Sequence, residues 1–349
     1  MQQPSFLGTE LPIIQAPMAG VQGAVLAAAV SNAGGLGSLP CAMLSLDALR
    51  AELNLLRTLT DRPFNVNFFC HQPPEPDAAR DLVWRTTLSP YYRELGVSMD
   101  GMVAGAGRAP FSAAYADLLE EHRPAVVSFH FGLPDAILVA RIRAWGALVL
   151  SSATTVDEAL WLQDHGADAI IAQGLEAGGH RGMFLSDDIT TQVGTLALLP
   201  QIVQAVRVPV IAAGGIVDAR GVAAALALGA SAAQVGTAYL LCPEAMTSAV
   251  HRAALQGPKS RHTALTNLFT GRPARGIVNR VMHELGPINS AAPAFPLATA
   301  AMALLRSEAE RRGSGDFSPL WSGQNASGCK PIGAADLTRE LAAGISGTF

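Results

Sequence analysis

The sequence predicts an α/β fold, a (β/α)8 barrel with an inserted excursion after the third strand and a C-terminal helical lid. Short apolar runs alternate with helix-like segments about eight times along the 349 residues. Most of these runs are apolar without alternation, which is typical of parallel strands that are covered on both faces. The first run leads into residues 16–20 and not into the GxGxxG turn of an open dinucleotide-binding sheet. A closed barrel is therefore favoured over an open sheet.

The expected strands of the barrel follow one another in the order of the chain. They are residues 13–18, 36–39, 64–69, 126–131, 148–151, 169–173, 208–213 and 233–237. Helices are expected between them at residues 21–31, 45–58, 135–144, 156–165, 196–205 and 218–228. Ser45, Thr155 and Asp218 stand at helix starts, where a short side-chain oxygen accepts from free backbone N–H groups.

Two segments exceed what a minimal barrel needs. Residues 70–124 are too long for one crossover, begin with three prolines and then become helix-like over residues 77–95, which indicates an excursion over the barrel mouth. Beyond the last strand, helices are expected at residues 246–256, 297–312 and 335–343. We therefore assign residues 1–70 and 113–243 to the barrel, and residues 71–112 and 244–349 to a helical lid on the substrate side.

Composition narrows the partners. The net charge of −4, with 15% charged residues and no basic run, predicts no nucleic-acid partner. Residues 222–242 are apolar, but their period changes from helix-like to strand-like at Gly229, so we expect a buried helix and strand and no membrane span. The four cysteines form no CxxC pair, and the first residues lack a signal pattern, so we expect free thiols and a cytoplasmic protein. The oligomeric state stays open between monomer and homodimer.

The stretch from 169 to 182 carries the most chemistry. An apolar strand runs into a loop in which four glycines surround His180, a group that can change charge near neutral pH. Barrel enzymes place catalytic residues on such loops after a strand. A plain surface loop with a solvated histidine is the alternative, and the stretch alone leaves both open.

Other strand ends are polar but uncharged. Asn67 and Gln173 offer amides suited to the edge of a heterocycle. Two glycine-containing pairs, Gly214 with Gly215 and Gly236 with Thr237, follow the last two strands, where barrels often bind phosphate on backbone N–H groups. The alternative for each pair is tight strand–helix packing, and both pairs together favour phosphate.

The sequence lacks the residues that several types of enzyme chemistry require. The only lysines, Lys259 and Lys330, lie on no expected strand, which argues against a Schiff-base aldolase. The chain has no HExxH, no His-x-His on a strand and no carboxylate pair at the strand ends, so we expect no metal and no glycosidase site. A neutral pocket with a phosphate site indicates a phosphate-bearing cofactor that brings its own reactivity.

A resemblance rests on motifs spread over nearly the whole chain. They are QAPMAG at 15–20, GGLG at 34–37, NVNF at 65–68, SFHFG at 128–132, AQG at 172–174, EAGGHRG at 176–182, AGGI at 213–216, VGT at 235–237 and WSGQ at 321–324. Together they resemble the FMN-dependent nitronate monooxygenases, also called 2-nitropropane dioxygenases. Related FMN barrels, a class of enoyl-ACP reductases and NADH:quinone reductases, have similar glycine–histidine loops. SFHFG, the long excursion and WSGQ favour the monooxygenases.

The resemblance implies oxidation of alkyl nitronates, such as propionate 3-nitronate, by O2 to a carbonyl compound and nitrite. It makes His180 the catalytic residue, which hydrogen-bonds the nitronate and removes the α-proton of a neutral nitroalkane. An NAD(P)H-dependent FMN reductase acting on a quinone or an enoyl thioester is the alternative. A flavin-carrying or phosphate-binding protein without turnover is the third interpretation.

The resemblance also implies the cofactor contacts, with FMN bound by the barrel. The expected residues are Pro17, Met18 and Ala19 at the isoalloxazine, Asn67 and Gln173 at its polar edge, Gly178 and Gly179 along the approach, Gly214, Gly215, Gly236 and Thr237 at the phosphate, and Trp321 and Gln324 closing the site. His130 is either a substrate contact or a hydrogen-bonded core histidine. Relatives often carry tyrosine where this chain has Phe295, and Arg306 is either a charge for an anionic substrate or a solvated arginine.

Overall fold

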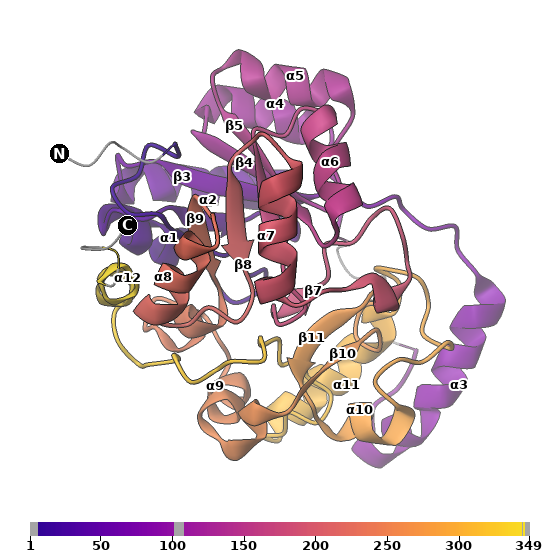
Figure 1. The fold of residues 1–349 in the computed structure, drawn as a ribbon. Helices are drawn as coiled ribbons and strands as arrows, with labels where there is room; N and C mark the ends of the chain where they lie inside the picture. The colour runs from indigo at the N-terminus through magenta and orange to yellow at the C-terminus, as the bar shows by residue number, and fades with distance from the viewer. Residues whose placement is uncertain (1–5, 101–107, 344, 346–349) are drawn as a thin grey trace.

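Eight parallel strands form a barrel in the computed structural model, which describes residues 6–100, 108–343 and 345. In chain order they are β1 Ile13–Gln15, β2 Gly37–Pro40, β3 Phe64–Phe69, β4 Val126–His130, β5 Leu148–Ala153, β6 Ala169–Gln173, β8 Val210–Ala213 and β9 Ala232–Val235. Their order in the sheet is β1-β9-β8-β6-β5-β4-β3-β2. A parallel bridge between Ile14 and Leu36 joins the first strand to β2 and closes the barrel. The predicted fold class is confirmed (Figure 1).

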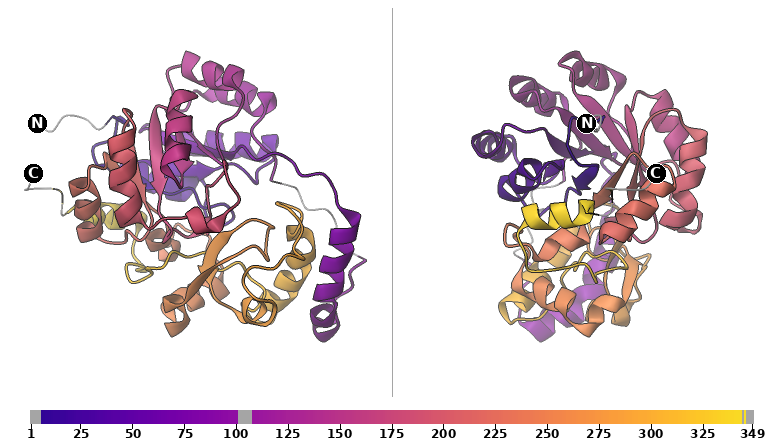
Figure 2. Two further views of the ribbon diagram at one scale, coloured as in Figure 1. Left: turned by 45° about the vertical axis from the view of Figure 1, so that its right-hand side comes forward. Right: turned by 60° about the vertical axis from the view of Figure 1, so that its left-hand side comes forward.

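Helices surround the strands, as both faces of a parallel sheet require (Figure 2). They are α1 Ala24–Asn32, α2 Leu46–Leu59, α4 Ala113–His122, α5 Ala136–Ala144, α6 Val156–Asp164, α7 Thr195–Ala205 and α8 Ala219–Ala227. The three expected caps are present: Ser45, Thr155 and Asp218 each accept a hydrogen bond from a backbone N–H in the first turn. The segment 222–242 belongs to α8, β9 and a following 3-10 turn, which share one buried apolar cluster.

The last helix corrects one expectation. We expected the whole of residues 244–349 at the lid, but α12 (Ala334–Ala342) packs against α1 and α8 on the outside of the barrel. Leu337 and Leu341 are buried in one apolar cluster with Ile13, Leu26 and Val222. The segment from 243 to 333 therefore interrupts the crossover after β9, and α12 takes the place of the eighth barrel helix. Sequence order does not reveal which neighbours an amphipathic helix covers.

The rest of the tail meets the excursion in a second body below the barrel mouth (Figure 1). Its helices are α3 Ala78–Leu95, α9 Ala249–Gln256, α10 Arg280–Leu285 and α11 Thr299–Arg311. The described chain also has short 3-10 turns at Ile189–Thr191, Thr237–Leu241 and Pro258–Arg261. Trp84 and Leu88 of α3 share a buried cluster with Met302 and Leu305 of α11. Residues 1–5, 101–107, 344 and 346–349 of the expected barrel, excursion and tail lie outside the described residues.

A small antiparallel sheet, which the sequence did not predict, connects this body to the barrel. It consists of β10 Thr263–Thr266, β11 Ala274–Ile277 and β7 Gly179–His180, with His180 opposite Ala274. Two residues of β7 are too few to show any strand period. All four cysteines are free thiols. Among the described residues, no helix combines the length and the apolar character that crossing a membrane requires.

Candidate active site

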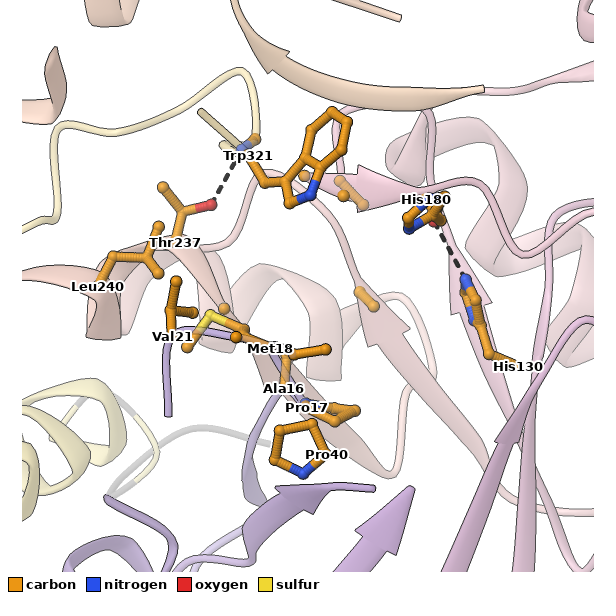
Figure 3. Close-up of a pocket in the computed structure, with 18 of the residues that line it drawn as sticks. Ala16, Pro17, Met18, Val21, Pro40, His130, His180, Thr237, Leu240 and Trp321 are labelled. Carbon is orange, nitrogen blue, oxygen red and sulfur yellow. Dashed lines mark hydrogen bonds between the residues drawn. The ribbon is translucent and has the colours of Figure 1, made fainter. Parts of the chain in front are cut away.

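A cavity lies between the carboxyl ends of the barrel strands and the second body (Figure 3). It brings together nearly all of the residues expected at the site: Pro17, Met18, Ala19, Asn67, His130, Gln173, Gly178, Gly179, His180, Gly214, Gly215, Gly236, Thr237 and Trp321. Gln324 differs, because it lines an adjoining pocket that shares only Gly214, Gly215, Ile216 and Asn325 with the cavity. The backbone N–H of Gln324 donates to the carbonyl of Glu176 at 2.9 Å.

His180 belongs to β7 of the small sheet, at the mouth of the barrel, and its ring lies among aromatic side chains. The ring centroid lies 5.3 Å from that of Phe295 and 5.6 Å from that of Trp321. Nε2 is 2.9 Å from the hydroxyl of Thr270, and no hydrogen bond to Nδ1 is found among the described residues. The alternative of a solvated surface loop is therefore wrong, and Nδ1 is the ring nitrogen left for a ligand.

Burial keeps the His180 imidazole neutral. Desolvation lowers its pKa well below 6.5, and the positive charge of Arg108 lowers it further. A neutral imidazole has one lone pair and one N–H. Since the Thr270 hydroxyl can donate to Nε2 or accept from it, His180 can present either of them at Nδ1.

Two side chains hold the backbone of His180 in place. Gln173 Nε2 and His130 Nε2 both donate to the His180 carbonyl, at 2.9 and 3.1 Å. The other ring nitrogen of His130 then accepts from Ser152 Oγ at 3.0 Å, and desolvation lowers the pKa of His130 to about 4. Both nitrogens of His130 are thus used within the protein, which favours the hydrogen-bonded core histidine over a substrate contact.

The loop is fastened on its other side by a buried arginine, whose role the sequence did not reveal. Arg181 is fully buried and donates to the carbonyls of Gln173 and Gly174, each at 2.7 Å, and to Gln192 at 2.8 Å. Burial lowers its pKa only to about 10, so it stays charged at neutral pH. These bonds tie the end of β6 to the segment that carries His180.

The glycines at the far end of the cavity leave backbone N–H groups unused. Gly214 and Gly215 have φ of 124° and 73°, which favours glycine, and their N–H groups donate to no acceptor among the described residues. A Cβ on Gly214 would lie 2.7 Å from Thr195 Oγ1. The turn at Gly214 and Gly215 therefore packs tightly against Thr195 and also leaves backbone N–H donors free. These are the two interpretations of the glycine pair that the sequence left open.

The tail loop closes this end. The N–H of Gly323 donates to Thr237 Oγ1 at 2.9 Å, and a Cβ on Gly178 would lie 2.6 Å from the Gly323 nitrogen. Trp321 is held through its carbonyl by His251 Nε2 at 3.0 Å. Asn67 donates through Nδ2 to Ser128 Oγ at 2.9 Å, while its Oδ1 accepts from no described residue.

Sequence reasoning missed several residues of this region. Arg108 and His251 line the cavity, and Arg272 lies over the ring of Phe131 with its guanidinium carbon 4.2 Å from the centroid. They come from the excursion and the tail, far from the strand-end motifs. No local pattern distinguishes them from surface cations, so only the fold could place them here.

The chain is similar to proteins of known family over nearly its whole length. A family model described as nitronate monooxygenase matches residues 3–344. The chain is 44% identical over 347 residues to a nitronate monooxygenase of Pseudomonas aeruginosa, with 98% of each chain covered. A solved structure of nitroalkane oxidase from Streptomyces ansochromogenes matches with TM-score 0.88 and 41% identity over 97% of this chain and 96% of that one. FabK from Thermotoga maritima matches with TM-score 0.71 and 27% identity over 97% and 93%. The resemblance drawn from the motifs is confirmed: the chain belongs to the nitronate monooxygenase family.

Proposed function

We propose that this chain is an FMN-dependent nitronate monooxygenase, which oxidises alkyl nitronates such as propionate 3-nitronate with O2 to a carbonyl compound and nitrite. The observation that carries the proposal is a neutral His180 with a free Nδ1, in the same cavity as a turn of unused backbone N–H groups. The family is flavin-dependent, and its match spans nearly the whole chain.

Two sets of polar groups in the cavity support FMN as the proposed cofactor. The free N–H groups of Gly214 and Gly215 suit a phosphate, and Asn67 Oδ1 is an acceptor without a partner among the described residues. A Cβ at Gly236 would lie 3.3 Å from the Ala16 side chain and would narrow the proposed phosphate end of the cavity. The proposed FMN contacts are Pro17, Met18, Ala19, Asn67, Gln173, Gly178, Gly179, Gly214, Gly215, Gly236, Thr237 and Trp321. When bound, FMN supplies the electron acceptor for the substrate and the site of O2 reduction.

In this proposal, His180 accepts a proton from the substrate or donates a hydrogen bond to it. With its lone pair at Nδ1, it accepts the α-proton of a neutral nitroalkane; with its N–H there, it donates to an oxygen of a nitronate. The carbonyl contacts from Gln173 and His130 fix the backbone that carries the ring. The aromatic rings of Phe295 and Trp321 pack against the imidazole and limit its movement, with centroids 5.3 and 5.6 Å from it.

We further propose that the barrel, residues 1–70 and 113–243, holds the FMN, while residues 71–112 and the tail from 244 to the start of α12 form the substrate side. A nitronate or nitroalkane and O2 would be the small-molecule partners. A cytoplasmic location is proposed as well, because four unpaired cysteines suit a reducing compartment.

An anaerobic titration tests the function. The purified protein is expected to be yellow, to lose its flavin absorbance on addition of ethyl nitronate, and to regain it on exposure to air with release of nitrite. NADH alone is expected to leave the spectrum unchanged. Bleaching by NADH with no response to nitronate would instead support the NAD(P)H-dependent FMN reductase, and a colourless protein that takes up no added FMN would refute both.

A further inference from the structure

Arg108 is a cation in the cavity that the proposed chemistry has not yet used. It lies at the end of the excursion and lines the cavity together with His180. Its Nη1 donates to Thr299 Oγ1, at the start of α11, at 3.0 Å. Its guanidinium carbon is 5.7 Å from the centroid of Phe295, and the ring of His180 packs against the same phenylalanine at 5.3 Å. The arginine and the histidine therefore flank one aromatic ring at one end of the cavity.

The charge of Arg108 has no counterion among the described residues. No carboxylate there forms an ion pair with it, and the other charge that acts on it is the positive Arg306. Burial lowers the pKa of Arg108 to about 10, so the guanidinium stays charged at neutral pH. Arg306 also lines the cavity, but it is largely exposed and paired with Glu310 at 2.8 Å.

A desolvated cation without a counterion is unfavourable unless a ligand supplies the negative charge. The guanidinium has five N–H donors, of which one is used by Thr299, so a planar pair of donors remains. The proposed phosphate site, which includes Thr237, is at the other end of the cavity from His180. Thr237 and His180 lie on opposite sides of the cavity (Figure 3). The anion that reaches Arg108 is thus more naturally the substrate than the cofactor phosphate.

We infer that Arg108 is the anion-binding residue of the substrate site, where its guanidinium takes the planar, negatively charged O–N–O group of a nitronate that faces His180. The match is geometric, since a guanidinium presents two parallel N–H bonds to two oxygens of a planar anion. This inference rests on the proposed function and specifies which side chain selects the anionic form of the substrate.

The test compares R108Q and R108K with R339Q, an exposed arginine of α12 outside the cavity, in the flavin-containing protein. Nitrate, a planar singly charged oxyanion, is titrated by calorimetry, and steady-state oxidation of ethyl nitronate is measured in parallel. R108Q is expected to raise the Kd for nitrate and the KM for ethyl nitronate about 10- to 100-fold, the usual range for one charged hydrogen bond. R108K is expected to restore part of the loss, and R339Q to stay within about twofold of wild type on the same scale.

The inference is overturned if wild type binds nitrate no more tightly than R108Q, or if R108Q leaves the KM for ethyl nitronate unchanged. Loss of flavin from R108Q, with unaltered nitrate affinity in the fraction that keeps it, also overturns it and makes Arg108 a cofactor contact. If wild type binds nitrate and R108Q does not, while neither oxidises any nitronate, the anion site stands and the proposed function fails.

Discussion

At the scale of single residues, the site depends on keeping one imidazole neutral and fixed. Desolvation is the main cause of the low pKa of His180, and nearby positive charges act in the same direction. Thr270 occupies Nε2, and two donors hold the backbone carbonyl, so the ring has little freedom. Such a histidine is available as a proton acceptor throughout the neutral range.

Replacing His180 with Asn tests this role. With nitroethane, kcat/KM is expected to fall about 10²- to 10⁴-fold, because Asn cannot accept the α-proton. With preformed ethyl nitronate, whose proton has already gone, the fall is expected to be smaller. The measurement is oxygen uptake with both substrates, with flavin content as a check on folding.

His262→Asn, at an exposed position outside the cavity, is the matched control. Equal activity of His180→Asn and the control on both substrates would remove His180 from the mechanism.

At the scale of elements, β7 connects the barrel to the second body. It has only two residues, yet it pairs with β11 of the second body, while Gln173 at the end of β6 donates to the His180 carbonyl and accepts from Arg181, which follows β7. The loop therefore has a fixed position because both bodies hold it. Gly182 completes the arrangement, since a Cβ there would lie 2.9 Å from His130 Cε1 and 3.0 Å from Ser152 Cβ.

The substitution Gly182→Ala is expected to displace the His130 ring and, through it, the His180 carbonyl. We expect kcat/KM for ethyl nitronate to fall at least about tenfold and the free energy of unfolding to drop by about 1–3 kcal/mol, as for other overpacked sites. Steady-state kinetics and urea unfolding measure the two effects.

Gly221→Ala is the control, because a Cβ on that residue of α8 would meet only ordinary contacts, the nearest at 3.4 Å. Its activity and stability are expected to match wild type or to gain slightly in stability. Wild-type behaviour of Gly182→Ala would show that the loop adapts freely and that His130 does not position it.

At the scale of the whole molecule, the barrel and the second body bury several histidines between them. The pKa values of His71, His130 and His251 are all lowered to about 4, in each case mainly by desolvation. Each of them must lose its proton to be buried. The fold therefore carries a dependence on pH that is separate from catalysis.

The direction in which the free energy of unfolding changes with pH follows from proton binding. Between pH 6.5 and about 4, the unfolded chain holds protons on these histidines and the folded chain does not, so acid favours unfolding. The free energy of unfolding is expected to fall steadily as the pH drops from 7.5 to 5, a range above the usual carboxyl pKa values. Urea titrations at several pH values measure it.

His251→Gln keeps a donor for the Trp321 carbonyl and removes the titration, so it is expected to make the decline shallower. The exposed His262→Gln is expected to leave the slope as it is. A free energy of unfolding that stays flat from pH 7.5 to 5 would contradict the buried, neutral state of these histidines.

Much of the fold and of the site follows from local patterns. Non-alternating apolar runs identify the barrel strands because each strand is covered on both faces, and the capping residues Ser45, Thr155 and Asp218 mark helix starts. Since the strands of a barrel are parallel, their carboxyl ends meet, so Asn67, Gln173 and the glycines could be assigned to one site without coordinates.

The tertiary structure decided what depends on distant segments. Only it placed α12 on the barrel, formed the β7–β11 pair, brought Arg108 beside Phe295 and His180, and used both nitrogens of His130 within the protein. The physical reason is the range of the forces involved. Backbone preferences and apolar periodicity act within a few residues and are visible along the chain, whereas burial, charge and hydrogen-bond partners at this site come from residues up to a hundred or more positions apart.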